Sequence, residues 1–100
     1  MNKSGYVYLI QYPNNHYKIG RSKSPANRLK QLQRTSPQRL YLLHTIRTPD
    51  MVALEKALHQ QYGTKKDRRG EYFRLSDDDV WAIASLISPK LLDAASQAAE

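Results

Sequence analysis

Residues Gly5–Arg21 read GYVYLIQYPNNHYKIGR, and this stretch has the clearest structural pattern in the chain. Its first part, Tyr6–Tyr12, is rich in tyrosine and aliphatic residues, which is typical of a β-strand. Pro13–Asn15 supplies residues that favour a turn, and His16–Arg21 has the composition of a second short strand. We therefore predict that the chain opens with an antiparallel hairpin.

The rest of the chain predicts helices and one more strand around this hairpin. The expected elements are a helix from Ser24 and Pro25 to near Ser36, a strand over Leu40–Arg47, a helix from Asp50 to Tyr62, a basic loop over Thr64–Gly70, an extended piece over Glu71–Leu75, a helix from Ser76 to about Ile87 and a last helix from Pro89. Ser24 and Ser76 are the expected N-caps, and Asp79 follows Ser76 at capping-box spacing. This irregular order predicts an α+β fold with a small mixed or antiparallel sheet flanked by helices.

Net charge is the strongest functional signal in the composition. The 100 residues leave room for one domain, and they carry a net charge of +7. Up to Leu75 there are 15 Lys or Arg residues against 4 acids, whereas from Ser76 there is 1 against 5. This asymmetry indicates a polyanionic partner, with nucleic acid ahead of an anionic membrane surface. The alternative is a set of solvated charges scattered around the whole domain.

The composition also excludes several classes of protein. There is no cysteine, which rules out disulfide bonds and thiolate zinc sites. The first residues lack the apolar core of a signal peptide, and no stretch approaches the roughly 18 apolar residues of a transmembrane helix. We therefore expect a soluble, cytoplasmic protein with no membrane partner.

The hairpin brings reactive side chains to one face of the sheet. Because side chains alternate along a strand, that face carries Tyr6, Tyr8, Ile10 and Tyr12 from the first strand and His16, Lys18 and Gly20 from the second. A turn centred on Pro13 places Tyr8 opposite Lys18, and one centred on Asn14 makes them diagonal neighbours. In either register the ammonium would favour the phenolate form of Tyr8 and help it accept a proton. Ordinary cross-strand packing is the alternative.

Four motifs taken in order resemble the GIY-YIG nuclease family. They are Gly5-Tyr6-Val7-Tyr8, Tyr17-Lys18-Ile19-Gly20, Arg28 and Glu55, and they look closest to the small phage and bacterial branch in which the second motif reads KIG. The resemblance covers Gly5 to Leu75. It implies a three-stranded, largely antiparallel sheet flanked by helices, and hydrolysis of phosphodiester bonds in DNA with one divalent metal ion, Mg²⁺ or Mn²⁺. Residues 1–75 would form the nuclease-like part, and residues 76–100 a helical extension packed on it within a single domain.

The resemblance also assigns roles to four residues. Tyr8 matches the tyrosine of the first motif and is the candidate general base. Lys18 stands where most members have the second tyrosine, and it would aid Tyr8 or contact the phosphate. Arg28 matches the family arginine and would bind the phosphate, and Glu55 matches the glutamate that holds the metal. Many members also have an asparagine beyond this glutamate, where the present chain reads Gly70-Glu71-Tyr72-Phe73.

The chemistry of these side chains fits phosphodiester hydrolysis. That reaction needs an activated water, a stabilised leaving oxygen and positive charge around the phosphate. A single carboxylate such as Glu55 suffices for Mg²⁺, which commonly completes its shell with phosphate oxygens and water. Arg28 offers a planar guanidinium to the phosphate oxygens. Without the resemblance, Glu55 would be a surface carboxylate paired with His59 one turn later, and Arg28 a solvated helix residue.

Further residues are candidates for weaker roles. Those expected to contact nucleic acid, besides Lys18 and Arg28, are Arg21, Lys23, Lys65, Lys66, Arg68 and Arg69. Those that could support the site are Tyr6, His16, Tyr17, Gly20 and His59. Each has a structural alternative, such as a solvated basic loop or a partly buried histidine. Asp77–Asp79 is better explained by helix capping than by metal binding, and Trp81, Ile83 and Leu86 are expected to pack the C-terminal helix.

Two functions of different classes remain open. One is a metal-dependent endonuclease, and the other is a nucleic-acid-binding module with the same fold and little or no activity. A basic adaptor for an acidic protein is a third possibility. Because the chain has room for a single domain, strong sequence specificity would need a second copy or a partner protein.

Overall fold

The structure is a computed structural model that describes residues 3–67 and 72–86. Its elements are β1 (Gly5–Tyr12), β2 (His16–Ser22), α1 (Pro25–Arg34), β3 (Tyr41–Thr48), α2 (Met51–Gln61), the 3₁₀ helix η1 (Gly63–Lys65), β4 (Phe73–Arg74) and α3 (Asp77–Ala84). The predicted α+β class is confirmed. The predicted last helix from Pro89 lies outside the described residues, as do Arg68, Arg69 and Glu71.

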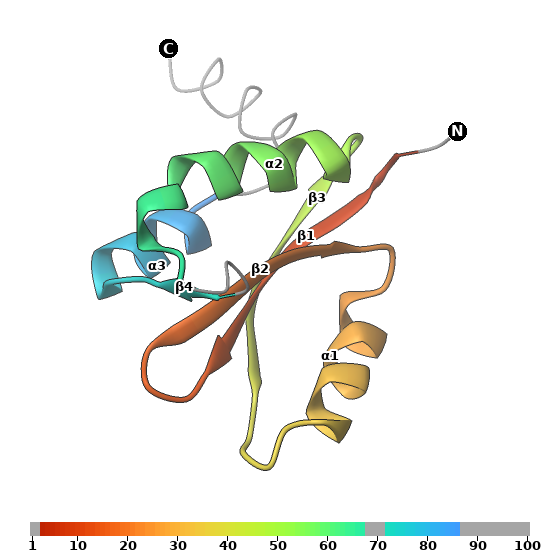
Figure 1. The fold of residues 1–100 in the computed structure, drawn as a ribbon. Helices are drawn as coiled ribbons and strands as arrows, with labels where there is room; N and C mark the ends of the chain where they lie inside the picture. The colour runs from red at the N-terminus through yellow and green to blue at the C-terminus, as the bar shows by residue number, and fades with distance from the viewer. Residues whose placement is uncertain (1–2, 68–71, 87–100) are drawn as a thin grey trace.

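The sheet is antiparallel and has the strand order β3-β1-β2-β4 (Figure 1). Three of its strands are the predicted ones, and β4 is an addition of two residues in the expected extended piece. β4 pairs with β2 at His16 and Tyr17. It reaches β2 because the chain doubles back between Lys66 and Phe73, which form an antiparallel bridge. Lys18–Ser22 therefore pairs with β1 on one side, and on its other side no strand among the described residues pairs with it.

The hairpin turn is centred on Asn14. The register pairs Tyr12 with His16, Ile10 with Lys18, and Tyr8 with Gly20. Asn14 and Asn15 both have positive φ, 63° and 60°, as required of the two central residues of the turn that suits twisted strands. Asparagine tolerates this conformation better than most residues. Of the two registers considered, the diagonal placement of Tyr8 and Lys18 is the one formed.

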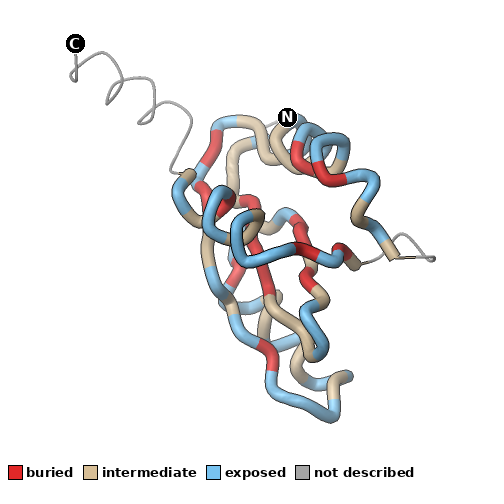
Figure 2. The backbone as a smooth tube through the Cα atoms, turned by 90° about the vertical axis from the view of Figure 1, so that its left-hand side faces the viewer, coloured by how far each residue is buried: buried red, intermediate tan, exposed pale blue. Residues whose placement is uncertain are grey.

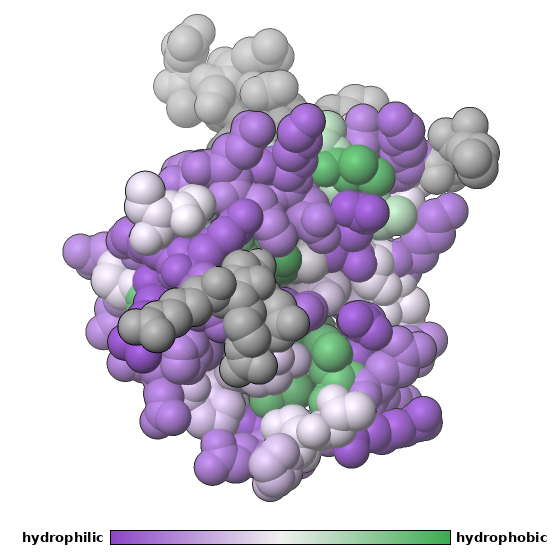
Figure 3. Space-filling model, viewed as in Figure 1, coloured by the Kyte–Doolittle hydropathy of each residue, from purple (hydrophilic) through white to green (hydrophobic). Residues whose placement is uncertain are grey.

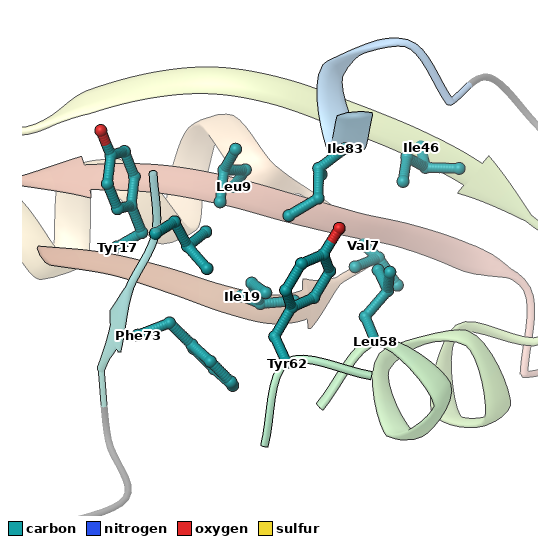
Figure 4. Packing of buried hydrophobic residues seen from close by; sticks show 10 residues of the cluster. Val7, Leu9, Tyr17, Ile19, Ile46, Leu58, Tyr62, Phe73 and Ile83 are labelled. Carbon is teal, nitrogen blue, oxygen red and sulfur yellow. The ribbon is translucent and has the colours of Figure 1, made fainter. Parts of the chain in front are cut away.

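Hydrophilic residues make up most of the surface seen in Figure 3, and apolar side chains cover both faces of the sheet beneath it. On one face α2 and α3 enclose the main core, part of which is seen in Figure 4: Val7, Leu9, Tyr17, Ile19, Ile46, Leu58, Tyr62, Phe73, Leu75 and Ile83. On the other face, which we call the α1 face, Leu29 and Leu32 of α1 pack against a smaller cluster of Tyr8, Ile10 and Leu40. Most of the buried residues lie on the strands of the sheet, and Figure 2 shows the buried positions in red.

Side-chain capping explains where two of the three described α-helices begin. The Asp50 carboxylate accepts a hydrogen bond from the Ala53 N–H, and Ser76 and Asp79 form the predicted capping box. Ser24 is the N-cap residue of α1 as predicted, but its side chain makes no capping hydrogen bond. The N–H of Ser24 instead donates to the Ser22 hydroxyl, and Pro25 begins the helix with a preset φ.

The last described helix differs from the expectation in two ways. It ends at Ala84 rather than near Ile87. Trp81 is 77% exposed, so its predicted packing role is wrong. The reason is the helical period: Ile83 is buried in the core and Val80 packs against it three residues earlier, so Trp81 falls outside that stripe. None of the helices in the described segments is long and apolar enough to span a bilayer.

Candidate functional site

Tyr8 lies against the backbone of Gly20. The tyrosine is 3% exposed on the α1 face, and a methyl group placed on Gly20 would overlap its hydroxyl and ring. Only a residue without a side chain allows this close approach. Gly20 thus has a definite role, because it lets the Tyr8 hydroxyl rest directly on β2.

We expect Gly20→Ala to destabilise the protein by roughly 1–3 kcal/mol, as overpacking of a well-filled core usually does. Tyr8 would have to move, and Ile10 and Leu40 pack beside it. Urea denaturation measures the effect. Gly63→Ala is the matched control, because a methyl there would meet no atom within 4 Å. Equal stabilities of the two variants would show that the Tyr8–Gly20 contact is loose.

Basic and phenolic groups gather on the α1 face around Tyr8. The ammonium of Lys18, diagonal to Tyr8, lies 5.7 Å from the centre of the Tyr72 ring. The Arg28 guanidinium donates a hydrogen bond of 3.2 Å to Gln31 Oε1. Burial raises the pKa of Tyr12 to about 12, aided by the neighbouring phenols Tyr72 and Tyr8 and opposed by the charge of Arg28. Tyr12 therefore shares one electrostatic environment with Tyr72, Tyr8 and Arg28.

The raised pKa of Tyr12 predicts a loss of stability at alkaline pH. The unfolded chain would release this proton at about pH 10, whereas the folded protein holds it to about pH 12. The stability that the raised pKa of Tyr12 contributes is fully present below about pH 10, the pKa in the unfolded chain. It is lost as the pH rises from about 10 to about 12, the pKa in the folded protein. Urea midpoints measured across this range should fall more steeply for the wild type than for Tyr12→Phe. Parallel curves would contradict the assignment.

Glu55 approaches β2 from the opposite face of the sheet. Its Oε1 accepts a 3.0 Å charged hydrogen bond from the Arg21 guanidinium, and the glutamate side chain is 20% exposed. Arg21 directly follows Gly20, so one dipeptide of β2 contacts Tyr8 on one face and Glu55 on the other. The two groups are thus tied to the same point of β2. The alternative pairing of Glu55 with His59 is not formed; each residue has a different partner.

His59 has a structural role, as a partly buried histidine with partners in the protein. Its Nε2 lies 2.7 Å from the carbonyl oxygen of Ile19, and its ring meets Phe73 edge-on at 5.0 Å. A ring nitrogen facing a carbonyl oxygen must carry the proton, so this nitrogen has no lone pair for a metal. His59 satisfies a backbone carbonyl of β2 beyond the reach of β4. It therefore positions β2 next to Glu55.

The donors around Glu55 suit one kind of metal site. Among the described residues, no three His, Cys, Asp or Glu side chains are grouped so that they could hold an ion. A lone carboxylate does not make a structural zinc site, which needs four protein ligands. It does fit Mg²⁺ or Mn²⁺ whose other ligands are substrate phosphate oxygens and water. The chain's own residues are compatible with the implied metal if the substrate completes the site.

The supporting candidates are divided between the two faces. His16 lies on the α1 face with Lys18, and its Nδ1 is 3.2 Å from the Pro13 carbonyl oxygen. Tyr6 is partly buried at the other end of that face, paired with Ser22. Tyr17 is 4% exposed and belongs to the main core, so the fold does not bring it to the same face as Tyr8.

The described part of the basic loop lies apart from Tyr8. Lys65 forms an ion pair with Asp79, which lowers the pKa of that carboxyl, and the Lys66 ammonium lies 5.6 Å from the centre of the Phe73 ring. Both lysines line a hollow of about 500 Å³ together with Arg74, a base that sequence reasoning did not single out. The sequence position of Arg74 could have indicated its exposure. It follows the buried Phe73 on the same strand, and successive side chains of a strand point to opposite faces. Lys23 is exposed between β2 and α1.

Sequence reasoning also assigned no role to Tyr12 or Tyr72, although Tyr12 was placed on the Tyr8 face. Their rings are in contact, with centroids 4.9 Å apart. The alternation of β1 could have drawn attention to Tyr12. Tyr72 could not have been found in this way, because it reaches the hairpin through the pairing of β4.

Comparison with known proteins gives one finding. Neither the curated proteins nor the solved structures yield a significant match. The family model described as the T5orf172 domain matches residues 5–88, a range that contains the hairpin, Arg28, Glu55 and α3. The match spans most of the chain and begins at the first residue of β1. The chain therefore belongs to the T5orf172 domain family, a nuclease-type domain of the GIY-YIG-like kind.

Proposed function

We propose that this protein is a metal-dependent endonuclease that hydrolyses phosphodiester bonds in DNA. Its catalytic residues would be Tyr8, Lys18, Arg28 and Glu55. The observation that carries the proposal is that Tyr8 contacts Gly20 and Glu55 contacts Arg21, two adjacent residues of β2, from opposite faces of the sheet in a nuclease-type family. The net charge of +7 favours a polyanionic substrate.

Two basic residues would bind the phosphate. The Arg28 guanidinium can donate two parallel hydrogen bonds to non-bridging oxygens, and the Lys18 ammonium adds a point charge. Glu55 would hold one Mg²⁺ or Mn²⁺, and a divalent ion supplies positive charge that stabilises the phosphate and the departing oxygen. If Arg21 gives up its contact with Oε1, both carboxylate oxygens of Glu55 can face the metal. Arg21 is 44% exposed, so its released guanidinium could turn to a DNA phosphate.

Tyr8 would act as the general base. As the oxygen of a water molecule forms its bond to phosphorus, one proton of that water passes to Tyr8 in its phenolate form, which becomes the neutral phenol. One P–O ester bond breaks, and the leaving oxygen takes its electron pair. The ring of Tyr8 is held between Gly20 and the small cluster with Ile10, so the position of its oxygen is set before substrate arrives.

An inactive binding module with the same fold is the second candidate. Two observations favour it: Glu55 is engaged by Arg21, and Lys18 stands in place of the usual second tyrosine. Both candidates predict DNA binding that weakens with salt. They differ in whether a phosphodiester bond is cut.

Nicking of supercoiled plasmid DNA tests the proposal. Purified protein is incubated with plasmid in Mg²⁺, in Mn²⁺ and in EDTA, and nicks should form with either metal and not with EDTA. Arg28→Ala should lower the rate by about 100-fold, the usual cost of removing a group that stabilises transition-state charge. Arg28→Lys should recover part of it, because an ammonium cannot make the two-pronged contact.

Arg34→Ala is the matched control, since Arg34 is an exposed arginine at the end of the same helix. It should nick at the wild-type rate. Nicking that is equal in Arg28→Ala and wild type would point to a contaminating nuclease and overturn the proposal. Salt-sensitive binding without any nicking would favour the inactive module.

A further inference from the structure

A second hollow lies on the hairpin side of Lys18. It has a volume of about 300 Å³, and its lining residues are Tyr12, Pro13, Asn14, His16, Asp67 and Tyr72. We call it the aromatic hollow. Its size is at the lower end of the roughly 300–1,000 Å³ usual for small-molecule sites, which suits a single planar ring system better than a large ligand.

The aromatic rings of this hollow meet at an angle. Tyr12 and Tyr72 are 4.9 Å apart at 62°, and His16 and Tyr72 are 6.4 Å apart at 65°. In such edge-to-face contacts one ring directs its rim at the other, so at least one aromatic face is left uncovered by its partner. Tyr72 is partly exposed. Aromatic faces of this kind are the surfaces on which proteins stack nucleobases.

The hollow is held in shape by hydrogen bonds. The Asp67 N–H donates to the Tyr72 carbonyl at 2.7 Å, and the Tyr72 N–H lies 3.4 Å from Asp67 Oδ1. On the other side, His16 Nδ1 is 3.2 Å from the Pro13 carbonyl oxygen. Rings that are fixed beforehand lose little freedom on binding. The site is therefore preorganised for a flat ligand.

A positive charge lies at the border of the aromatic hollow. The Lys18 ammonium is 5.7 Å from the Tyr72 ring centre, where it would attract a phosphate. The Tyr12 and Tyr72 rings are in contact, so a base would stack on an uncovered ring face rather than between them. This arrangement matches a nucleotide whose base stacks in the hollow while its phosphate stays near Lys18.

We propose that the aromatic hollow binds an unpaired nucleobase of the DNA strand whose phosphate is held by Lys18. A base within a duplex has both faces covered by its neighbours and cannot stack on a protein ring without leaving the helix. The substrate class is therefore DNA with a single-stranded segment or an extruded base next to the cut. This inference rests on the proposed nuclease for its link to cutting, whereas the binding itself does not depend on activity.

Binding measurements in EDTA test the inference without cleavage. Fluorescence anisotropy compares the full-length protein on a labelled single strand and on an abasic strand of the same length, which has the same phosphates and no bases. The wild type should prefer the strand with bases. Tyr72→Ala should weaken that complex about tenfold, within the range measured for loss of one base–aromatic stack, and should leave the abasic complex unchanged.

Two further variants keep the test sharp. Tyr72→Phe should bind like the wild type, because it keeps the stacking ring, and Tyr41→Ala should too, because Tyr41 is a 54% exposed tyrosine on β3 outside the hollow. Equal weakening of both strands by Tyr72→Ala, or no weakening, would overturn the inference. A base preference that depends on Tyr72 in a protein that cuts neither plasmid nor DNA with a single-stranded segment, in Mg²⁺ or Mn²⁺, would refute the nuclease alone. Nicking without any base preference would refute this inference alone.

Discussion

Replacing Glu55 with alanine should abolish metal-dependent nicking while leaving DNA binding and the fold nearly intact. Among the described residues, no group of three or more His, Asp or Glu side chains could hold an ion in its place. We therefore expect the rate at saturating Mg²⁺ to fall by more than about 100-fold, the scale on which lost charge stabilisation acts. The lost contact with Arg21 is partly exposed and should cost at most about 1 kcal/mol of stability.

Plasmid nicking, DNA binding in EDTA and urea denaturation together measure these effects. Glu55→Gln refines the test, because its amide oxygen can still accept from Arg21 while the negative charge is gone. It should be as inactive as Glu55→Ala. Asp78→Asn removes an exposed carboxylate in the first turn of α3 and should keep full activity. A wild-type rate in both Glu55 variants would show that the metal is held elsewhere or not needed.

Replacing Tyr8 with phenylalanine should also remove most of the activity. A positioned general base contributes about 10²- to 10⁴-fold to a rate, so we expect a loss of at least about 100-fold. The ring would stay packed beside Ile10 and over Gly20, so the protein should remain folded. Single-turnover nicking at saturating protein separates this loss of rate from a loss of binding.

The exposed Tyr41 provides the matched control for Tyr8, and Tyr41→Phe should be fully active. Full activity in Tyr8→Phe would mean that its hydroxyl takes no part and that the contact with Gly20 serves packing alone. Gly20→Ala adds an independent test. If the position of the hydroxyl matters, that variant should lose more activity than its loss of stability explains.

The hairpin shows how far local patterns reach. Alternation along Tyr6–Tyr12 correctly placed Tyr8 and Lys18 on one face, because the direction of a side chain depends on its place in its own strand. The same pattern could not choose between turns centred on Pro13 and Asn14, since both keep that alternation. The pairing of Tyr8 with Gly20 shows that the turn is centred on Asn14, and Asn14 and Asn15 form that turn with positive φ.

The candidate site shows the limit of the same reasoning. Helical spacing suggested that Glu55 pairs with His59, yet Glu55 contacts a residue 34 positions away and His59 one that is 40 positions away. Both partners lie on β2. The motif resemblance named Tyr8 and Glu55, but it gave no indication that they meet β2 from opposite faces.

Local sequence patterns suffice for the features that depend on residues a few positions apart. These are the strands of the hairpin, the cap at Ser76 and the concentration of positive charge before Ser76. Which distant side chains meet depends on the tertiary structure. The packing of α2 against β2 brings Glu55 to Arg21, and the pairing of β4 with β2 brings Tyr72 to Tyr12. Such contacts arise because each element buries its apolar face, and that burial fixes the place of every polar residue beside it.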